Sequence, residues 1–466
     1  MTTQPAQTIA ATGFTDAATC GFSPDASGVA NLAALQRAVD GGGTIVVSQP
    51  GVYRIAGTVF IGSDTALRFG HGVVLRKVDE QGPFMHVLLN KGALTRVADE
   101  HILIEGLTLE VNSMDVRQPV IYGLLGHISF FHVKDLRIER FRCPDLCQQQ
   151  YCIHVCTFED LIIDDVIISG EKDGVHLGRG KRFRISNGVF KTFDDAIALN
   201  AHDYDVGNPE MGWIEDGLIE NCHDLDAENT TGYFCRILAG GWIDWQTGME
   251  VQKSDTVVSE GRLYRVFAEA DGKVYRSLTR PTHASGRAEL DGITWVMVQG
   301  DVTYTAGVRN VTFRSIFLSK PRTAFSVHFD NDKWSRSYYP GARVPQQQGL
   351  VFDDIRVLHR KDSNLLEIGT PVDVVTISNS SIHTNRIVHW NNRAMSDWMK
   401  TTINLVGCTF TAPGSLELLH NQAPGKHFAL RTTACLALHD DFTASVAAGP
   451  GTVAVTSDLP GLEVSG

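Results

Sequence analysis

Three aspartates between Glu171 and Asn200 have the residue type and spacing that acid–base chemistry requires. Asp194 and Asp195 are adjacent, and Asp173 precedes them by about twenty residues, the length that one coil of a stacked β solenoid consumes. Stacked coils would bring all three carboxylates to one face. Carboxylates so close together cannot all ionise cheaply, so at least one of them holds a proton near neutral pH. The segment therefore predicts an acid–base hydrolase.

Adjacent aspartates also occur at ordinary turns. Two other Asp-Asp pairs of this chain, in EDLIIDDV and LVFDDIRV, are interpreted as solvated turn residues. Asp194 and Asp195 differ because AIALNAHD follows them and Asp173 precedes them by one coil. Cation binding is a third interpretation, since calcium takes oxygen ligands. Catalysis is the interpretation that we favour, and we predict no bound metal.

A short strand motif recurs along most of the chain and supplies the coils that this argument needs. Two apolar residues flank one position, polar turn residues follow, and the gaps between copies are mostly about 22 to 40 residues. Helical repeats, helices between strands and the tight hairpins of a β-propeller are not indicated. We therefore predict an all-β chain folded as a right-handed parallel β-helix. The copies are Leu136 and Ile138, Leu161 and Ile163, Phe183 and Ile185, Ile219, Val311 and Phe313, Leu350 and Phe352, Val375 and Ile377, and Ile403 and Leu405.

The N-terminal region predicts a cap for the solenoid. Asp25 to Asp40 carries apolar residues at helical spacing, with Leu32, Leu35 and Val39 on one side. Short strands with turn signals between them follow, as TIVV, VYRI, TVFI, ALRF and VVLR. A helix over the end would protect the open strand edges from aggregation.

One segment departs from the repeat. Residues 243–302 carry their own aromatics, Tyr264, Tyr275 and Trp295, and their own Asp-Gly turns, which predicts a small β module inserted between residues 1–242 and 303–466 of the β-helix. The module resembles, weakly, small modules of phage tail proteins and carbohydrate-binding appendages. A lid or packing insertion is one interpretation, and a sugar-contacting or oligomerising module is the other.

Composition narrows the function classes. The chain has 466 residues, 43% of them hydrophobic, and a net charge of −12, which argues against a nucleic-acid partner. No window is apolar enough to predict a membrane span, and no signal peptide is recognisable, so localisation stays open.

The chain has nine cysteines, an odd number, so at least one of them is unpaired. Four of them, Cys143, Cys147, Cys152 and Cys156, lie near His154, and we interpret them as buried thiols rather than disulfides or zinc ligands.

The motifs together resemble the polygalacturonase-type glycoside hydrolases (family 28-like), within the pectate-lyase-like superfamily of right-handed β-helices. ANLAALQRAVDGGGTIVVSQPGVYRI looks like the cap and first coil of that superfamily. EKDG stands where the family has Asn-Thr-Asp, and FDDAIAL stands where it has an Asp-Asp triplet. The resemblance implies that Asp194 protonates the leaving oxygen, while Asp173 and Asp195 position and deprotonate water. It also implies inversion, with acid and base about 6.5 to 9.5 Å apart.

Two of the family's four signatures are missing. Where Gly-His-Gly is expected the chain has GYFCRILAGG, with Arg236 nearest the histidine position, and where Arg-Ile-Lys is expected it has AFSVHF, with Ser326 and His328. Arg236, Arg322 and His328 are the candidates to replace the missing basic residues. A neutral sugar and a uronic acid remain equal substrate hypotheses. Further expected groove residues are His176, His202, Asp203, Asp330, Asp332 and Trp334.

The predicted function is therefore a glycosidase acting on a polysaccharide or oligosaccharide. Alternatives are a lyase or epimerase of the same fold, and a tail-spike-like glycan-binding or depolymerising protein. No cofactor is predicted, although the lyase alternative admits a bound calcium. The expected partner is a carbohydrate, with neither a nucleic acid nor a membrane, and the expected assembly is a monomer or a homotrimer.

Overall fold

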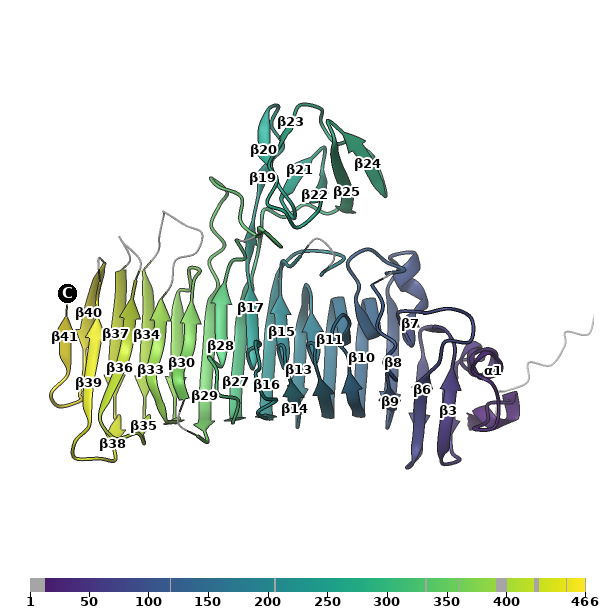
Figure 1. The fold of residues 1–466 in the computed structure, drawn as a ribbon, viewed down its shortest axis with the longest axis horizontal. Coiled ribbons are helices and arrows are strands. Elements are labelled where there is room, and N and C mark those ends of the chain that lie inside the picture. The colour runs from purple at the N-terminus through teal and green to yellow at the C-terminus, as the bar shows by residue number, and fades with distance from the viewer. Residues whose placement is uncertain are drawn as a thin grey trace, which may run out of the picture.

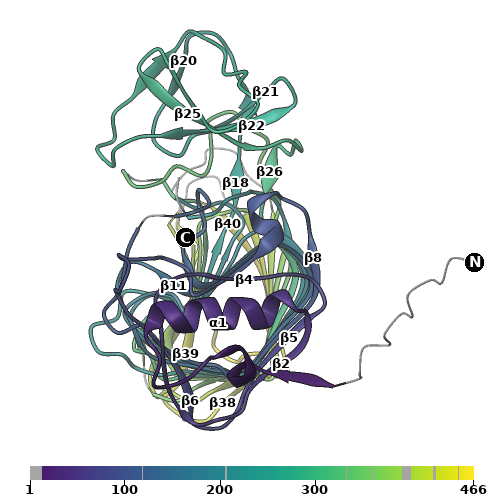
Figure 2. The same ribbon diagram turned by 90° about the vertical axis from the view of Figure 1, so that its right-hand side faces the viewer.

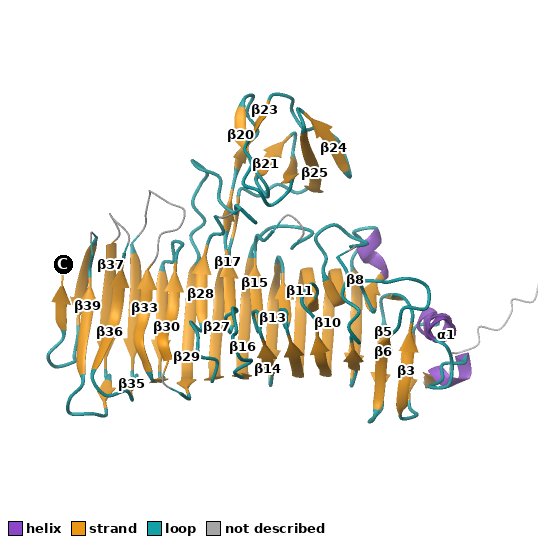
Figure 3. Cartoon of the chain, in the orientation of Figure 1, coloured by secondary structure: helices purple, strands orange, loops and turns teal. Residues whose placement is uncertain are grey.

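The chain winds into an elongated right-handed parallel β-helix, as predicted (Figure 1). The computed structural model describes residues 13–117, 119–204, 207–331, 333–359, 361–390, 400–422, 427–449 and 451–465. Their parallel strands form one sheet of 32 strands, and Figure 3 shows how little helix accompanies it. No helix among the described residues is long and apolar enough to cross a membrane.

The sheet folds around three faces of each coil, and a strand inside the stack pairs with strands of the coils before and after it. The face that carries the site comprises β4 (Val59–Ile61), β7 (Leu88–Asn90), the beginnings of β10 (Gly126–Leu146) and β11 (Tyr151–Gly170), β12 (Val175–Leu177), β15 (Ile197–Asn200), β17 (Cys235–Leu238), β28 (Phe325–His328), β30 (Lys361–Ile368), β33 (Thr384–Trp390), β36 (Ser415–Asn421), β39 (Thr443–Ala447) and β41 (Glu463–Ser465).

The other two faces complete the coil, and the long strands β10, β11, β16, β27 and β29 bend from one face to the next. The second face comprises β1 (Phe14–Asp16), β2 (Gly43–Val47), β5 (Thr65–Phe69), β8 (Asp99–Glu105), β13 (Gly180–Ser186), β16 (Ile214–Asp224), β27 (Val308–Leu318), β29 (Gln348–Val357), β31 (Val374–Ser378), β34 (Thr401–Val406), β37 (His427–Thr433) and β40 (Thr452–Thr456). The third comprises β3 (Gly51–Ile55), β6 (Val73–Lys77), β9 (Thr108–Glu110), β14 (Val189–Thr192), β32 (Ser381–Ile382), β35 (Thr409–Phe410) and β38 (Leu436–Ala437).

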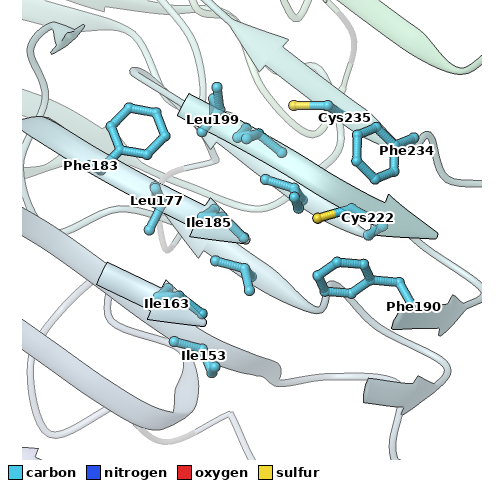
Figure 4. Packing of buried hydrophobic residues seen from close by; sticks show 14 of the residues in the cluster. Ile153, Ile163, Leu177, Phe183, Ile185, Phe190, Leu199, Cys222, Phe234 and Cys235 are labelled. Atoms are coloured by element: carbon cyan, nitrogen blue, oxygen red, sulfur yellow. The ribbon is translucent and has the colours of Figure 1, made fainter. Parts of the chain in front are cut away.

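The recurring strand motif forms the core of the solenoid. Every apolar residue that defines the motif is buried, and equivalent residues stack from coil to coil. Ile163 lies opposite Ile185, which in turn lies opposite Ile219. Phe313 and Phe352 continue the same line with parallel rings whose centroids are 5.0 Å apart. Figure 4 shows part of this core beneath the site.

Four coils turn between the second and third faces at an Asn or Asp residue with positive φ. Asp165, Asn187, Asn221 and Asp354 occupy this position with φ between 51° and 56°. Asn and Asp tolerate the left-handed region because their short side chains bond locally. The other two Asp-Asp pairs are thus turn residues, as predicted.

Helix α1 (Gly28–Asp40) lies across the N-terminal end of the solenoid (Figure 2). Leu35 and Val39 are buried against the first coil, and Leu32 is partly buried there. The prediction began the helix too early, at Asp25. Ser27 is the N-cap, and its side chain accepts a hydrogen bond from the Ala30 N–H (3.1 Å), which fixes the start at Gly28. Two short 3-10 helices are η1 (Ala17–Cys20) and η2 (Lys91–Leu94).

The inserted segment folds as a small β module above the site face (Figures 1 and 2). The antiparallel pair of β18 and β26 joins it to the solenoid, and Tyr264 and Trp295 are buried in a separate apolar core. Its strands are β18 (Gly240–Gly241), β19 (Ile243–Asp244), β20 (Met249–Val251), β21 (Thr256–Ser259), β22 (Arg262–Phe267), β23 (Tyr275–Ser277), β24 (Arg287–Leu290), β25 (Ile293–Gln299) and β26 (Thr305–Ala306).

The nine cysteines are free thiols. Cys143, Cys152 and Cys156 are buried, and Cys147 is half-buried. His154 is engaged elsewhere, because its Nδ1 accepts a hydrogen bond from the Leu125 N–H (3.0 Å). The cluster is therefore part of the packing of β10 and β11.

Inward and outward positions of one strand provide a test of this core. Ile163 is fully buried, whereas Ile167, four residues later in β11, is 41% exposed. We expect Ile163→Ala to destabilise the protein by about 2 to 5 kcal/mol through the cavity that it leaves, and Ile167→Ala by less than about 1 kcal/mol. Urea unfolding of both variants measures the difference, and equal losses would contradict the assignment of faces.

Candidate functional site

The three predicted acids lie together on the site face. Asp173 and Asp195 precede β12 and β15 by equal numbers of residues, and the register of these strands places the two aspartates at equivalent positions of consecutive coils. One oxygen from each of Asp173, Asp194 and Asp195 lies within 4.8 Å of the other two. Asp173 and Asp195 are buried, whereas Asp194 is partly exposed. The spacing in sequence was thus a sound guide to proximity in space.

The turn that carries Asp194 and Asp195 is fixed by the coil above it. The N–H groups of Thr231 and Gly232 both donate to the Phe193 carbonyl at 3.0 Å. A Cβ on Gly232 would lie 1.9 Å from the carbonyl carbon of Asp194, so only glycine permits this approach. The Tyr233 N–H then donates to Asp195 Oδ1 (2.9 Å). Backbone packing therefore sets the position of the acids.

Lys172 neutralises part of the charge. Its ammonium group contacts Asp194 and lies 3.6 Å from Asp173 Oδ1. Burial opposes the charged form of Lys172, but Asp173 and Asp194 outweigh it and raise its pKa.

A buried network of residues with alternating charge lies beside the acids. His176 and Arg236 stand two coils apart on one line, with Ala198 between them. The small Ala198 leaves room for Asp203, which lies 3.3 Å from His176 Nε2 and 3.3 Å from an Arg236 nitrogen. Asn200 Nδ2 also donates to Asp203 (2.9 Å). Such a network keeps buried charges paired.

Two residues of this network also contact acids of the cluster, Asp173 and Asp195. His176 Nδ1 lies 3.0 Å from Asp173 Oδ2, and Arg236 Nε lies 3.2 Å from Asp195 Oδ2. Burial lowers the pKa of His176, yet the hydrogen bonds and charges of Asp173 and Asp203 outweigh it and raise the pKa. For Asp203, burial is likewise overcome, by Arg236 and His176, and its pKa is lowered.

The environment separates the pKa values of Asp173 and Asp195. Burial raises the pKa of Asp195 to about 7, with Asp194 and Asp173 adding to the effect and Arg236 opposing it. Burial acts in the same direction on Asp173, but Lys172 and His176 overcome it and lower the pKa to about 2. The site can therefore present one ionised and one protonated carboxyl group near neutral pH, which is the pairing that acid–base catalysis needs.

Two pockets flank Lys172. The larger, of about 750 Å³, is lined by Lys172, Lys191, Phe193 and Asp194, so Asp194 is the acid that faces a substrate-sized space. The smaller, of about 300 Å³, lies between the solenoid and the module, and Tyr151, Tyr204 and Trp334 line it together with Lys172. Lys172 is common to both pockets.

The remaining predicted residues lie around this centre. Arg322 stacks over the Tyr233 ring at 5.0 Å, and His328 accepts or donates one hydrogen bond with Ser326 (2.8 Å) and pairs with Asp330 (3.4 Å). His202 is fully buried, and its Nε2 contacts Thr256 of the module (3.2 Å). Its place is thus beneath the module and not on the groove surface. Asp332 lies outside the described residues.

Sequence reasoning missed Lys172, Tyr151 and Tyr204. Lys172 stands inside the EKDG motif, and a cation beside an acid was a usable signal. Tyr151 precedes Asp173 by one coil, and its ring stacks on His176 at 3.9 Å. Tyr204 follows Asp203 in a loop, and no repeat marks its position.

The separation of the acids differs from the expectation for inversion. Acid and base of an inverting glycosidase stand about 6.5 to 9.5 Å apart. The nearest oxygen atoms of Asp173, Asp194 and Asp195 all lie within 4.8 Å of one another. Inversion therefore stays a prediction that rests on the resemblance.

Comparison with solved structures identifies the fold. The thermostable α-1,3-glucanase of glycoside hydrolase family 87 from Streptomyces thermodiastaticus is 13% identical, with a TM-score of 0.52 over 100% of this chain and 70% of that one. The tailspike protein of E. coli bacteriophage HK620 is 8% identical, with a TM-score of 0.52 over 95% and 75%. An exopolygalacturonase from Thermotoga maritima is 12% identical, with a TM-score of 0.45 over 96% and 92%. The chain therefore shares the right-handed β-helix fold with the glucanase and the tailspike.

No protein-family model matches the sequence, and no curated protein is significantly similar to it.

The raised pKa of Asp195 can be tested without knowing the substrate. With ¹³C-labelled aspartate, infrared spectroscopy should show a carboxylic acid band that is lost as the pH rises through about 7, because Asp195 is protonated below this pH and ionised above it. A second band, lost through about pH 6, is expected from Asp255, whose pKa burial also raises. Asp195→Asn should abolish the transition at about pH 7. Asp271→Asn, an exposed change in the module, should leave it intact. A transition at about pH 7 that persists in Asp195→Asn would assign the proton to another group.

Proposed function

We propose that the protein is a glycoside hydrolase that cleaves a polysaccharide or oligosaccharide at the Asp173, Asp194 and Asp195 cluster. The observation that carries the proposal is the separation of pKa values between Asp173 and Asp195 beside a pocket that Asp194 lines. A carbohydrate substrate is further supported by two proteins with the same fold. One is an α-1,3-glucanase, and the other, the tailspike, has been solved in complex with a hexasaccharide.

The three acids divide the work of hydrolysis. Asp194 reaches the pocket. When its ion pair with Lys172 opens, it takes up the proton that Asp195 holds and donates it to the glycosidic oxygen as the bond from that oxygen to the anomeric carbon breaks. Water attacks the anomeric carbon and gives its proton to Asp173, whose low pKa keeps it ionised and ready to act as the base. Asp195, with a pKa of about 7, is the proton store of the cluster: it supplies Asp194, and it is reprotonated when the proton that Asp173 took from water passes back to it.

Removal of the proposed acid tests the function. Asp194→Asn keeps the shape but cannot donate the proton, and we expect the rate of hydrolysis to fall by about 10² to 10⁴. Release of reducing ends from a broad panel of glycans measures it. Asp164→Asn is the matched control, because Asp164 also belongs to an Asp-Asp pair but bonds Ser186 and Asn187 away from the site.

The same assay separates hydrolysis from the alternatives. A product that absorbs in the near ultraviolet would indicate a lyase and remove hydrolysis. Unchanged degradation by Asp194→Asn would remove the catalytic assignment, and a wild-type protein that binds but never cleaves the panel would favour a glycan-binding protein.

The stereochemistry of the product tests the finer prediction. Proton NMR of the first sugar released should show the anomer opposite to that of the substrate if the reaction inverts. Initial retention of the anomeric configuration would contradict inversion and would agree with the short separation of the carboxylates.

A further inference from the structure

The inserted module completes a pocket beside the acids. Lys253 of the module and Arg117 of the solenoid lie on the wall of the 300 Å³ pocket, which Lys172 separates from the larger pocket at Asp194. Tyr204 and the exposed Trp334 supply aromatic surface on the same wall. The pocket is therefore built from segments that the sequence separates widely and that only the insertion brings together.

The lining of this pocket has a definite charge. Among the described residues that form it, Arg117, Lys172 and Lys253 are cationic and none is acidic, and of these three Lys172 also pairs with Asp173 and Asp194 behind the wall. The chain as a whole carries a net charge of −12, so this concentration of cations runs against the average surface. Tyr and Trp rings present flat apolar faces with polar edges, which suit the face of a sugar ring. Cations and aromatic rings in one concave site fit a sugar that bears an anionic group.

We propose that this pocket binds a sugar ring carrying a carboxylate or sulfate group, and that the module thereby directs the protein to anionic glycans. The proposal rests on the proposed function, because the pocket adjoins the acids that would cleave the chain. Lys253 and Arg117 hold the anionic group, and Trp334 and Tyr204 contact the ring. The module is then a specificity element.

Two contacts hold the module against the rest of the chain near this pocket. Arg265 is fully buried in it and donates to the Tyr204 carbonyl of the solenoid (2.8 Å). Arg336, two residues after Trp334, forms a two-point ion pair with Asp255, two residues after Lys253. These contacts tie together the segments that carry Tyr204, Trp334 and Lys253, and such preorganisation lowers the entropic cost of binding.

Lys172 connects the pocket to the chemistry. It lines both pockets and contacts Asp194. An anionic group in the smaller pocket offers Lys172 a second partner, and this competition frees Asp194 to face the scissile bond. A neutral sugar offers no such partner.

Binding measured by calorimetry tests the proposal separately from catalysis. The full chain carrying Asp194→Asn prevents turnover, and the probes are galacturonate, mannuronate and sulfated chondroitin tetrasaccharides, with cellotetraose as the neutral probe. We expect at least one anionic probe to bind, more weakly as salt rises. Adding Lys253→Gln, which keeps most of the stem, should weaken that binding about tenfold through the loss of one charge-assisted contact. The carboxylated and sulfated probes distinguish the two anionic groups.

Lys273→Gln is the matched control, because Lys273 is also in the module but lies over the Tyr275 ring, outside the pocket. It should leave binding unchanged. Equal affinity for cellotetraose, no binding of any anionic probe, or an unchanged Kd in Lys253→Gln would each overturn the proposal. Hydrolysis of neutral glycans by the wild type would leave the proposed function standing while removing this one. Binding that depends on Lys253 without any cleavage would support the anionic-sugar pocket and contradict the proposed hydrolase function.

Discussion

Register between successive coils is the constraint on which the rest of this structure depends. A strand inside the solenoid forms its backbone hydrogen bonds with the coils on either side, so its residues have equivalents in the coils before and after. The line through Ile163, Ile185 and Ile219 fills the interior in this way. The same rule places Asp195 above Asp173 on the outside. Core and site are two consequences of one register.

Stacking like residues is favourable for apolar side chains and costly for acids. The chain offsets the cost with a neighbouring line of residues, in which Arg236 stands two coils from His176 and Asp203 fills the gap left by Ala198. The negative charges of the two buried acids are not equally compensated. Asp173 has Lys172 and His176 beside it, whereas Asp195 has mainly Arg236. That inequality, and not burial alone, divides the acids into an ionised and a protonated member.

The insertion adds what the repeat cannot provide. A uniform solenoid presents a long open face, and each coil contributes only its own outward residues. The module returns the chain over this face, and Arg265 and the Arg336–Asp255 pair lock it there. The result is a bounded pocket beside the acids in place of an open groove. Gly232 also shapes the site, because the absence of a side chain lets the next coil pack directly against the turn at Asp194.

The sequence alone determined the coil, because period and apolar spacing are local properties: the strand motif, the N-terminal helix and the proximity of Asp173 to Asp194 and Asp195 all followed from it. It missed the start of α1 by three residues, since the Ser27 cap outweighed helical spacing. Only the tertiary structure decided which acids are buried, that His202 lies beneath the module, and that Lys253 and Tyr204 line one pocket. These contacts join segments with no shared period, so long-range packing alone fixes them.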